Sequence, residues 1–80
     1  MDFLINHIEA LIFCSPVPIK LSDLKACLSE MFNADIPEDD ILNAVKKLEE
    51  KFSSDEYAFQ IFKSAGGYQF LTKPAYQASI

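Results

Sequence analysis

Residues 57–72, with the sequence YAFQIFKSAGGYQFLT, decide the fold, because apolar residues alternate here after three segments in which they follow helical spacing. In the first half of this stretch, Phe59 and Ile61 are expected to face the core, and Phe62 is expected to point outward. The alternation therefore predicts a β-strand that is covered on one face only.

The glycines in the middle of this stretch predict a tight turn. Glycine adopts positive φ without steric cost, so Ala65, Gly66 and Gly67 are expected to form the turn of a β-hairpin. The second strand then covers residues 68–72, and Pro74 is expected to begin a new helix.

Upstream of the hairpin, residues 3–14 are expected to form a helix. One side carries an apolar stripe made of Leu4, Ile8, Leu11 and Ile12. Phe3, Ile5 and Phe13 add apolar surface on other sides, and a helix that is apolar nearly all round needs more than one neighbour. We therefore expect these three residues, together with the outward Phe62, to form the interface of a homodimer.

The remaining elements are a short strand and two helices, over about residues 19–21, 22–33 and 35–52. Ser22 is the expected N-cap of the first of these helices, and Asp35 and Glu38 have the spacing of a capping box at the start of the second. Their expected inner stripes are Leu24, Cys27, Leu28, Met31 and Phe32, and then Ile41, Val45, Leu48 and Phe52. Helix, strand, helix, helix and hairpin is the order of a winged helix, a mostly helical α+β fold whose wing is the hairpin.

The charge of the chain argues against nucleic acid as its main partner. The chain has 12 acidic residues against 7 basic ones, with a net charge of −5, and all the basic residues are lysine. Arginine is the preferred residue for bidentate contacts to phosphate and guanine. The helix that would enter the major groove, over residues 37–52, contains five acidic residues and three lysines. Its net charge is therefore −2. A DNA-binding winged-helix transcriptional regulator is the alternative function, and this charge distribution disfavours it.

The sequence offers little for catalysis or metal binding. His7 is the only histidine, and no nucleophile has a base and an orienting group near it in the pattern that covalent catalysis needs. Cys14 and Cys27 are too far apart for paired zinc ligands, and both are expected to be small buried apolar residues. No enzyme, metal site or cofactor is predicted. No stretch is apolar enough to span a membrane, and the acidic start at Asp2 is unlike a secretory signal, so a cytoplasmic protein is expected.

Two stretches carry a family resemblance. Residues 8–13, IEALIF, followed by Ser15-Pro16, resemble the opening of bacterial segregation and condensation protein B, and residues 65–76, AGGYQFLTKPAY, resemble its hairpin and exit. The resemblance covers essentially the whole chain. It implies a non-catalytic factor in chromosome partition and condensation that has two winged-helix domains, dimerises, and binds the kleisin subunit, ScpA, and through it the SMC ATPase. It also implies that the first domain mainly dimerises and that the second makes much of the kleisin contact.

The resemblance sets expectations for domains. Residues 1–73 are expected to be the first winged-helix domain, and residues 74–80 the start of a linker or helix toward a second domain that is absent here. Kleisin binding by this chain alone is then expected to be weak. One alternative to the homodimer also remains, in which Tyr76 and Ile80 fold back over the surplus apolar residues of the first helix.

Overall fold

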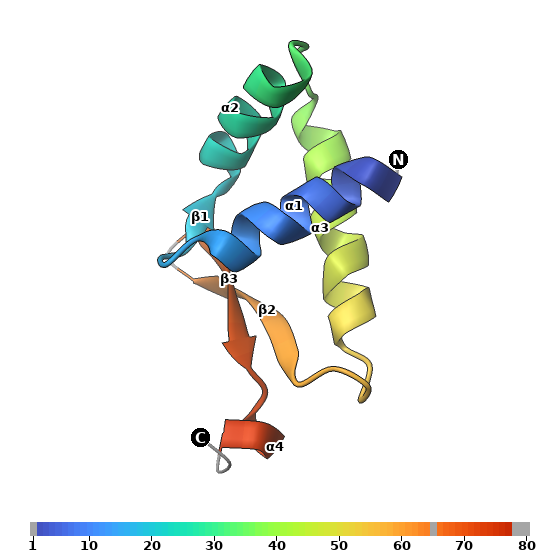
Figure 1. Cartoon of the computed structure of the whole chain (residues 1–80), viewed down its shortest axis with the longest axis vertical. Coiled ribbons are helices and arrows are strands. Elements are labelled where there is room, and N and C mark those ends of the chain that lie inside the picture. The colour runs from blue at the N-terminus through green and yellow to red at the C-terminus, as the bar shows by residue number, and fades with distance from the viewer. Residues whose placement is uncertain (1, 65, 78–80) are drawn as a thin grey trace.

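Three helices pack beside a small antiparallel sheet, and a short fourth helix follows the last strand (Figure 1). The computed structural model describes residues 2–64 and 66–77. The elements are α1 (Asp2–Cys14), β1 (Ile19–Lys20), α2 (Leu21–Phe32), α3 (Glu38–Phe52), β2 (Phe59–Ser64), β3 (Gly67–Thr72) and α4 (Pro74–Gln77). This order confirms the predicted winged helix, and the helix at Pro74 is present as expected.

The start of α2 differs from the prediction. The helix begins at Leu21, and its N-cap is Lys20, which has an extended backbone and makes no side-chain capping bond. The prediction of Ser22 as N-cap is therefore wrong. The physical reason is the sheet, because Lys20 is still paired with Gly67 in β3 and the chain passes from strand to helix without an intervening residue.

The predicted capping box of α3 is also absent. The helix begins at Glu38, and its N-cap is Pro37, which offers no side-chain acceptor. Instead of capping the helix, the Asp35 carboxylate lies 3.3 Å from the Lys25 Nζ on α2. Lys25 Nζ also donates to the Ile36 carbonyl at 3.0 Å. These contacts attach the connection between α2 and α3 to α2 rather than to the helix that follows it.

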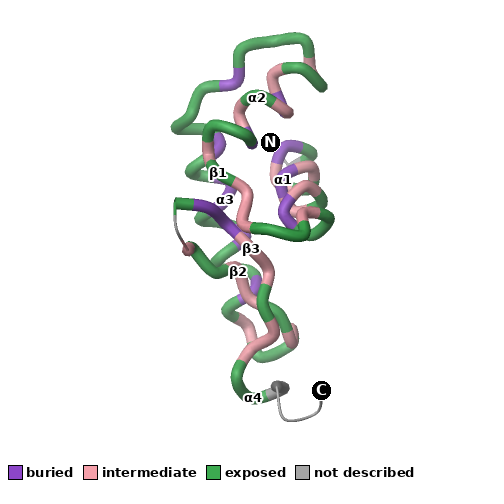
Figure 2. Tube along the Cα trace, turned by 90° about the vertical axis from the view of Figure 1, so that its left-hand side faces the viewer, coloured by how far each residue is buried: buried purple, intermediate pink, exposed green. Residues whose placement is uncertain are grey.

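The core lies where α1, α2 and α3 meet (Figure 2). Its fully buried residues are Ile8, Ile12, Leu24, Leu28, Ile41, Val45 and Leu48. The predicted stripe of α3 is confirmed, whereas Met31 of α2 is 51% exposed and was wrongly placed inside. Cys14 is exposed and Cys27 is half-buried, so the prediction of two buried cysteines is also wrong. Met31 lies in the last turn of α2, and Cys14 is the last residue of α1, where fewer neighbours cover a side chain.

The sheet has the order β1-β3-β2, and β3 is its central strand. Ile61 packs against the core as expected, but Phe59 is 45% exposed, which corrects the prediction that it faces the core. Phe59 opens β2 opposite Thr72, at the end of the hairpin away from β1. Gly66 has a φ of +78°, as expected in the turn, and Ala65 lies outside the described residues.

The second turn glycine begins β3 and permits a close contact. A Cβ at Gly67 would lie 2.8 Å from Pro18 Cβ and 3.0 Å from the Pro18 carbonyl carbon. A real Cβ does not approach other atoms so closely, and the absence of a side chain allows β1 to approach β3 at this point.

Lys73 closes the base of the wing. Its backbone N–H donates to the Ala58 carbonyl at 2.7 Å, and its Nζ donates to the Ser54 carbonyl at 2.6 Å. α4 follows at the far end of the hairpin (Figure 1). Ile80 and the side chain of Tyr76 lie outside the described residues, so the alternative in which they cover the first helix stays a prediction.

Candidate interaction surfaces

The described residues, 2–64 and 66–77, offer surfaces rather than a chemical centre. Within these ranges no group of three His, Cys, Asp or Glu side chains is placed to hold a metal ion. The ring of His7 packs edge-on against Phe32 at 5.1 Å between centroids, which gives this histidine a packing role. None of the helices described is long and apolar enough to cross a membrane. The candidate functional residues are therefore the exposed apolar ones.

The side of α1 that faces away from the core forms the first surface. Its residues are all exposed and are Phe3, Asn6, Ala10, Phe13 and Cys14, which we call the outer face of α1. Successive helical residues are rotated by about 100° around the axis, so these positions gather on one side while the buried stripe occupies the other. Phe3 is 52% exposed and Phe13 is 66% exposed.

None of the five described residues that make up the outer face of α1 is charged. Glu9, an acid of the same helix, is half-buried and turns toward α3, where its Oε1 lies 3.0 Å from the Lys51 Nζ. A surface without charge in a chain of net charge −5 is where a second acidic molecule meets the least repulsion.

Both phenylalanines of this face are held by one aromatic contact each. The ring of Phe3 meets Phe32 edge-on at 5.6 Å, and the ring of Phe13 meets Phe70 of the wing at 6.0 Å. Phe3, Asn6, His7 and Ala10 line a shallow, open depression toward the first half of α1. The two exposed rings are therefore held in place by aromatic neighbours that lie outside the outer face of α1.

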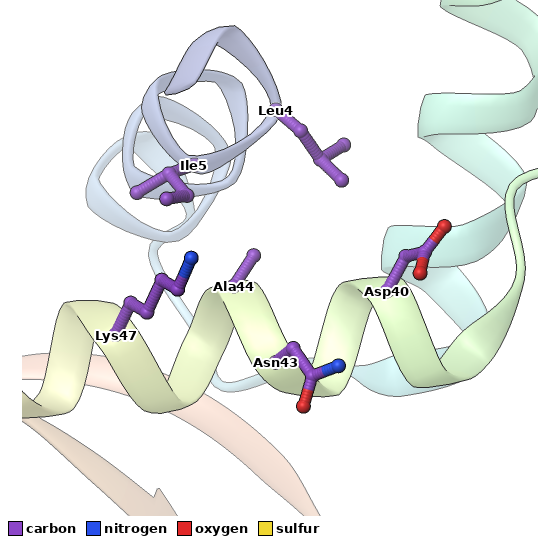
Figure 3. Close-up of a pocket in the computed structure, with 6 residues that line it drawn as sticks. All are labelled: Leu4, Ile5, Asp40, Asn43, Ala44 and Lys47. Atoms are coloured by element: carbon purple, nitrogen blue, oxygen red, sulfur yellow. The ribbon is translucent and has the colours of Figure 1, made fainter. Parts of the chain in front are cut away.

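Ile5 belongs to a different place, a groove of about 280 Å³ between α1 and α3 (Figure 3). Its lining residues are Leu4, Ile5, Asp40, Asn43, Ala44 and Lys47. Asp40, Ala44 and Lys47 project from α3 on the side of α1 (Figure 3). Ile5 is half-buried and packs against the core, so it is less available to a partner than Phe3 and Phe13.

The wing carries the remaining surface. Phe62 is 47% exposed, which confirms its predicted outward orientation. It pairs with Gln69, and the next pair on the same face is Gln60 with Leu71, which is 37% exposed. The opposite face of the hairpin carries Ile61 and Phe70, which pack against the core. Phe62 therefore points away from the side on which α1 contacts the sheet.

The four residues predicted to form one interface thus occupy three places. Phe3 and Phe13 share the outer face of α1, whereas Ile5 lies in the groove and Phe62 lies on the outside of the wing. Cys14, Asn6 and Ala10 complete the outer face, and the last two were not predicted because they are not large apolar residues. Helical spacing was the signal that could have found them, since both fall between Phe3 and Phe13 on the same side of the helix.

The exposed side of α3 is acidic at its leading end. Glu38, Asp39 and Asp40 form the first turn and are all exposed, whereas the lysines lie further along the helix. A recognition helix presents its N-terminal residues to the bases and phosphates of the major groove. Carboxylates in that position repel the phosphates that supply most non-specific affinity for DNA.

Comparisons with known proteins agree with the observed fold. The family described as segregation and condensation complex subunit ScpB matches residues 6–80. The crystal structure of a conserved hypothetical protein from Chlorobium tepidum is similar, with a TM-score of 0.76 and 31% identity over 98% of this chain and 46% of that one. ScpB from Mycobacterium tuberculosis has the same fold, with a TM-score of 0.78 and 13% identity over 98% of this chain and 45% of that one. The chain thus spans less than half the length of either protein. A search of curated protein sequences found no match.

Proposed function

We propose that this chain, which belongs to the family of segregation and condensation complex subunit ScpB, is a non-catalytic scaffold domain that forms a homodimer. In the whole protein it would take part in binding the kleisin subunit, ScpA, and through it the SMC ATPase. The observation that carries the dimer is the outer face of α1, where two large rings are exposed on a surface without charge.

Burial of Phe3 and Phe13 would supply most of the free energy of association. Full burial of one such side chain contributes about 1.5–3 kcal/mol, and each ring still has more than half of its surface to bury. A symmetric dimer covers both rings of both chains, because the same patch is used twice. Four partly exposed rings give several kcal/mol in favour of association, which opposes the cost of bringing two chains together.

The test of the dimer is the molar mass in solution, measured by sedimentation equilibrium over a wide range of concentrations. We expect the wild-type chain to be a dimer and Phe13→Asp to be a monomer with an unchanged helical circular-dichroism signal. Phe62→Asp is the matched control, because it places the same charge on an equally apolar exposed site on the wing, and it should remain dimeric. A wild-type chain that sediments as a monomer at high concentration would refute the proposal.

Kleisin binding by this chain alone is proposed to be weak. The support is its span, since it covers 46% and 45% of the two solved proteins that it resembles. Calorimetry with the purified central region of the kleisin tests this point. Tight binding by the isolated chain would place the main kleisin site within these residues instead.

A further inference from the structure

We propose that the free edge of β2 is a docking site for an extended, acidic segment of another protein, which adds a fourth strand to the sheet. Backbone groups of Phe59, Ile61 and Lys63 bind the main chain of this segment, and the Lys63 side chain binds a carboxylate on it. The docking site lies on the wing, so it is independent of the proposed homodimer on α1.

The two edges of the sheet differ in how well they are protected (Figure 1). β1, at one edge, has two residues, Ile19–Lys20, and directly follows Pro18. β2, at the other edge, has six residues, no proline, and an unbroken register with β3. Short length, prolines and bulges are among the features that keep other strands from pairing with a sheet edge. β2 has none of these three, so its edge can accept a strand.

The register with β3 determines which backbone groups of β2 point outward. The Lys73 N–H donates to the Ala58 carbonyl, and these two residues continue the β2–β3 register by one step. In an antiparallel ladder, bonded pairs of this kind alternate with pairs whose N–H and carbonyl groups point away from each other. The N–H and carbonyl groups of Phe59, Ile61 and Lys63 therefore point away from β3. Within the part of the chain that the structure describes, no hydrogen bond is made to them.

Side-chain exposure along β2 agrees with an edge that a partner can reach. Phe59 is 45% exposed and Lys63 is exposed, with the half-buried Ile61 between them. On the other face of the hairpin, Phe62 and Leu71 are exposed as well. A strand that pairs with β2 would thus satisfy the free backbone groups and also bury apolar surface on both faces of the sheet.

The distribution of charge favours an acidic partner. All 12 acidic residues of the chain lie before residue 57, and the charged residues that follow are Lys63 and Lys73. The Lys73 Nζ is already bonded to the Ser54 carbonyl. The Lys63 Nζ lies 5.9 Å from the centroid of the Tyr68 ring, and no described carboxylate pairs with it. A carboxylate opposite Lys63 on an added strand would form a cross-strand ion pair.

Two other occupants fit this edge less well. A second copy of β2 brings no carboxylate to Lys63, because the strand contains this lysine and no acid. DNA would bring negative charge, but its phosphates cannot donate hydrogen bonds to the free carbonyl groups of Phe59 and Ile61. A polypeptide strand supplies both donors and acceptors at the required spacing, and its side chains can include the acid.

The test uses NMR and a capped peptide of sequence Thr-Glu-Val-Val-Thr-Val-Thr, designed to pair antiparallel to β2. Its glutamate would lie opposite Lys63, and its three valines opposite Phe62, Ile61 and Phe59. With peptide at about ten times its dissociation constant, amide exchange at Phe59, Ile61 and Lys63 should slow about tenfold, because these groups are open only in the free chain. Exchange at Gln60 and Phe62, which are bonded to β3, should change little.

Matched peptides separate backbone pairing from charge. N-methylation of the glutamate and of the valines opposite Ile61 and Phe59 removes the N–H groups that would face β2, so it should abolish the slowing. Lysine in place of the glutamate should weaken binding to the wild-type chain, and Lys63→Glu should reverse this preference. Phe59→Pro removes one outward N–H without breaking a bond to β3 and should weaken binding, whereas Phe59→Val keeps this N–H and is its control.

Three results would overturn the inference. The first is unchanged exchange at Phe59, Ile61 and Lys63 in millimolar peptide. The second is equally tight binding of the N-methylated peptide, which would mean that the backbone of β2 is not what holds it. The third is a DNA duplex that shifts the wing signals where the peptide does not, since the charge of Lys63 would then serve phosphates.

Discussion

Replacing Gly67 by alanine should destabilise this domain more than replacing its neighbour Gly66. The added Cβ at position 67 would lie 2.8 Å from Pro18 Cβ, 3.0 Å from the Pro18 carbonyl carbon and 3.2 Å from the Ile19 nitrogen. None of these atoms belongs to the free end of a flexible side chain, so relief requires β1 to move away from β3. Overpacking of this kind costs about 1–3 kcal/mol, and three close contacts to nearly rigid atoms place this site at the upper end.

Gly66→Ala is the control for conformational strain without a clash. Gly66 has a φ of +78°, but a Cβ there would meet nothing within 4 Å. The expected cost is about 1 kcal/mol, from the left-handed backbone alone. For a domain of this size, 1 kcal/mol corresponds to a change in Tm of about 4–8 °C, so thermal unfolding followed by circular dichroism separates the two variants clearly.

The reasoning can be tested further by removing the nearest obstacle. Pro18→Gly deletes the Cβ that the new methyl group would strike, so Gly67→Ala should cost less in that background than in the wild type. If urea unfolding gave Gly67→Ala a free energy of unfolding within about 0.5 kcal/mol of the wild-type value, β1 could move away from β3 at little cost. The close approach of Pro18 to Gly67 would then not be a constraint on the sequence.

Three further outcomes are expected. Leu28→Ala should lower the free energy of unfolding by about 2–5 kcal/mol, because Leu28 is 0% exposed. Met31→Ala on the same helix should lower it far less, because Met31 is 51% exposed. Similar losses at both sites in urea titrations would contradict the packing described. Lys51→Met should lower the free energy of unfolding by no more than about 1 kcal/mol, because the Glu9–Lys51 pair is partly exposed. The difference from wild type should shrink in high salt, which screens the pair. A loss of stability that does not depend on salt would point to lost packing instead. Finally, a titration with duplex DNA at low salt should detect no binding in the micromolar range, because acids lead α3; strong binding that weakens steeply with salt would support the alternative function.

The order of elements could be predicted from the sequence because each element has its own periodicity. The stripe of α3, with Ile41, Val45 and Leu48, was identified from helical spacing alone, and all three are buried. The starts of α2 and α3 were not predicted correctly, because capping preferences consider only the local sequence, whereas contacts with neighbouring elements determine where these two helices begin. β1 leads directly into α2, so no residue is left to act as a separate cap, and Lys25 draws Asp35 away from the start of α3.

The candidate surfaces were predicted only in part, for a related reason. Counting large apolar residues identified Phe3 and Phe13, but it could not show that Ile5 lies in the groove beside α3. Nor could it show that α1 packs on the face of the hairpin opposite Phe62, because that depends on which helix covers which side of the sheet. Small and polar positions such as Ala10 can be assigned to the outer face of α1 only once the direction of the helix relative to the core is known.

The two hydrogen bonds of Lys73 have a mechanical consequence. They join the exit of β3 both to Ala58 at the entry of β2 and to Ser54 in the connection from α3, so the base of the wing is tied to the end of α3. A force applied at the exit of β3 would therefore reach α3 through two hydrogen bonds as well as through the chain itself, and α3 packs against α1.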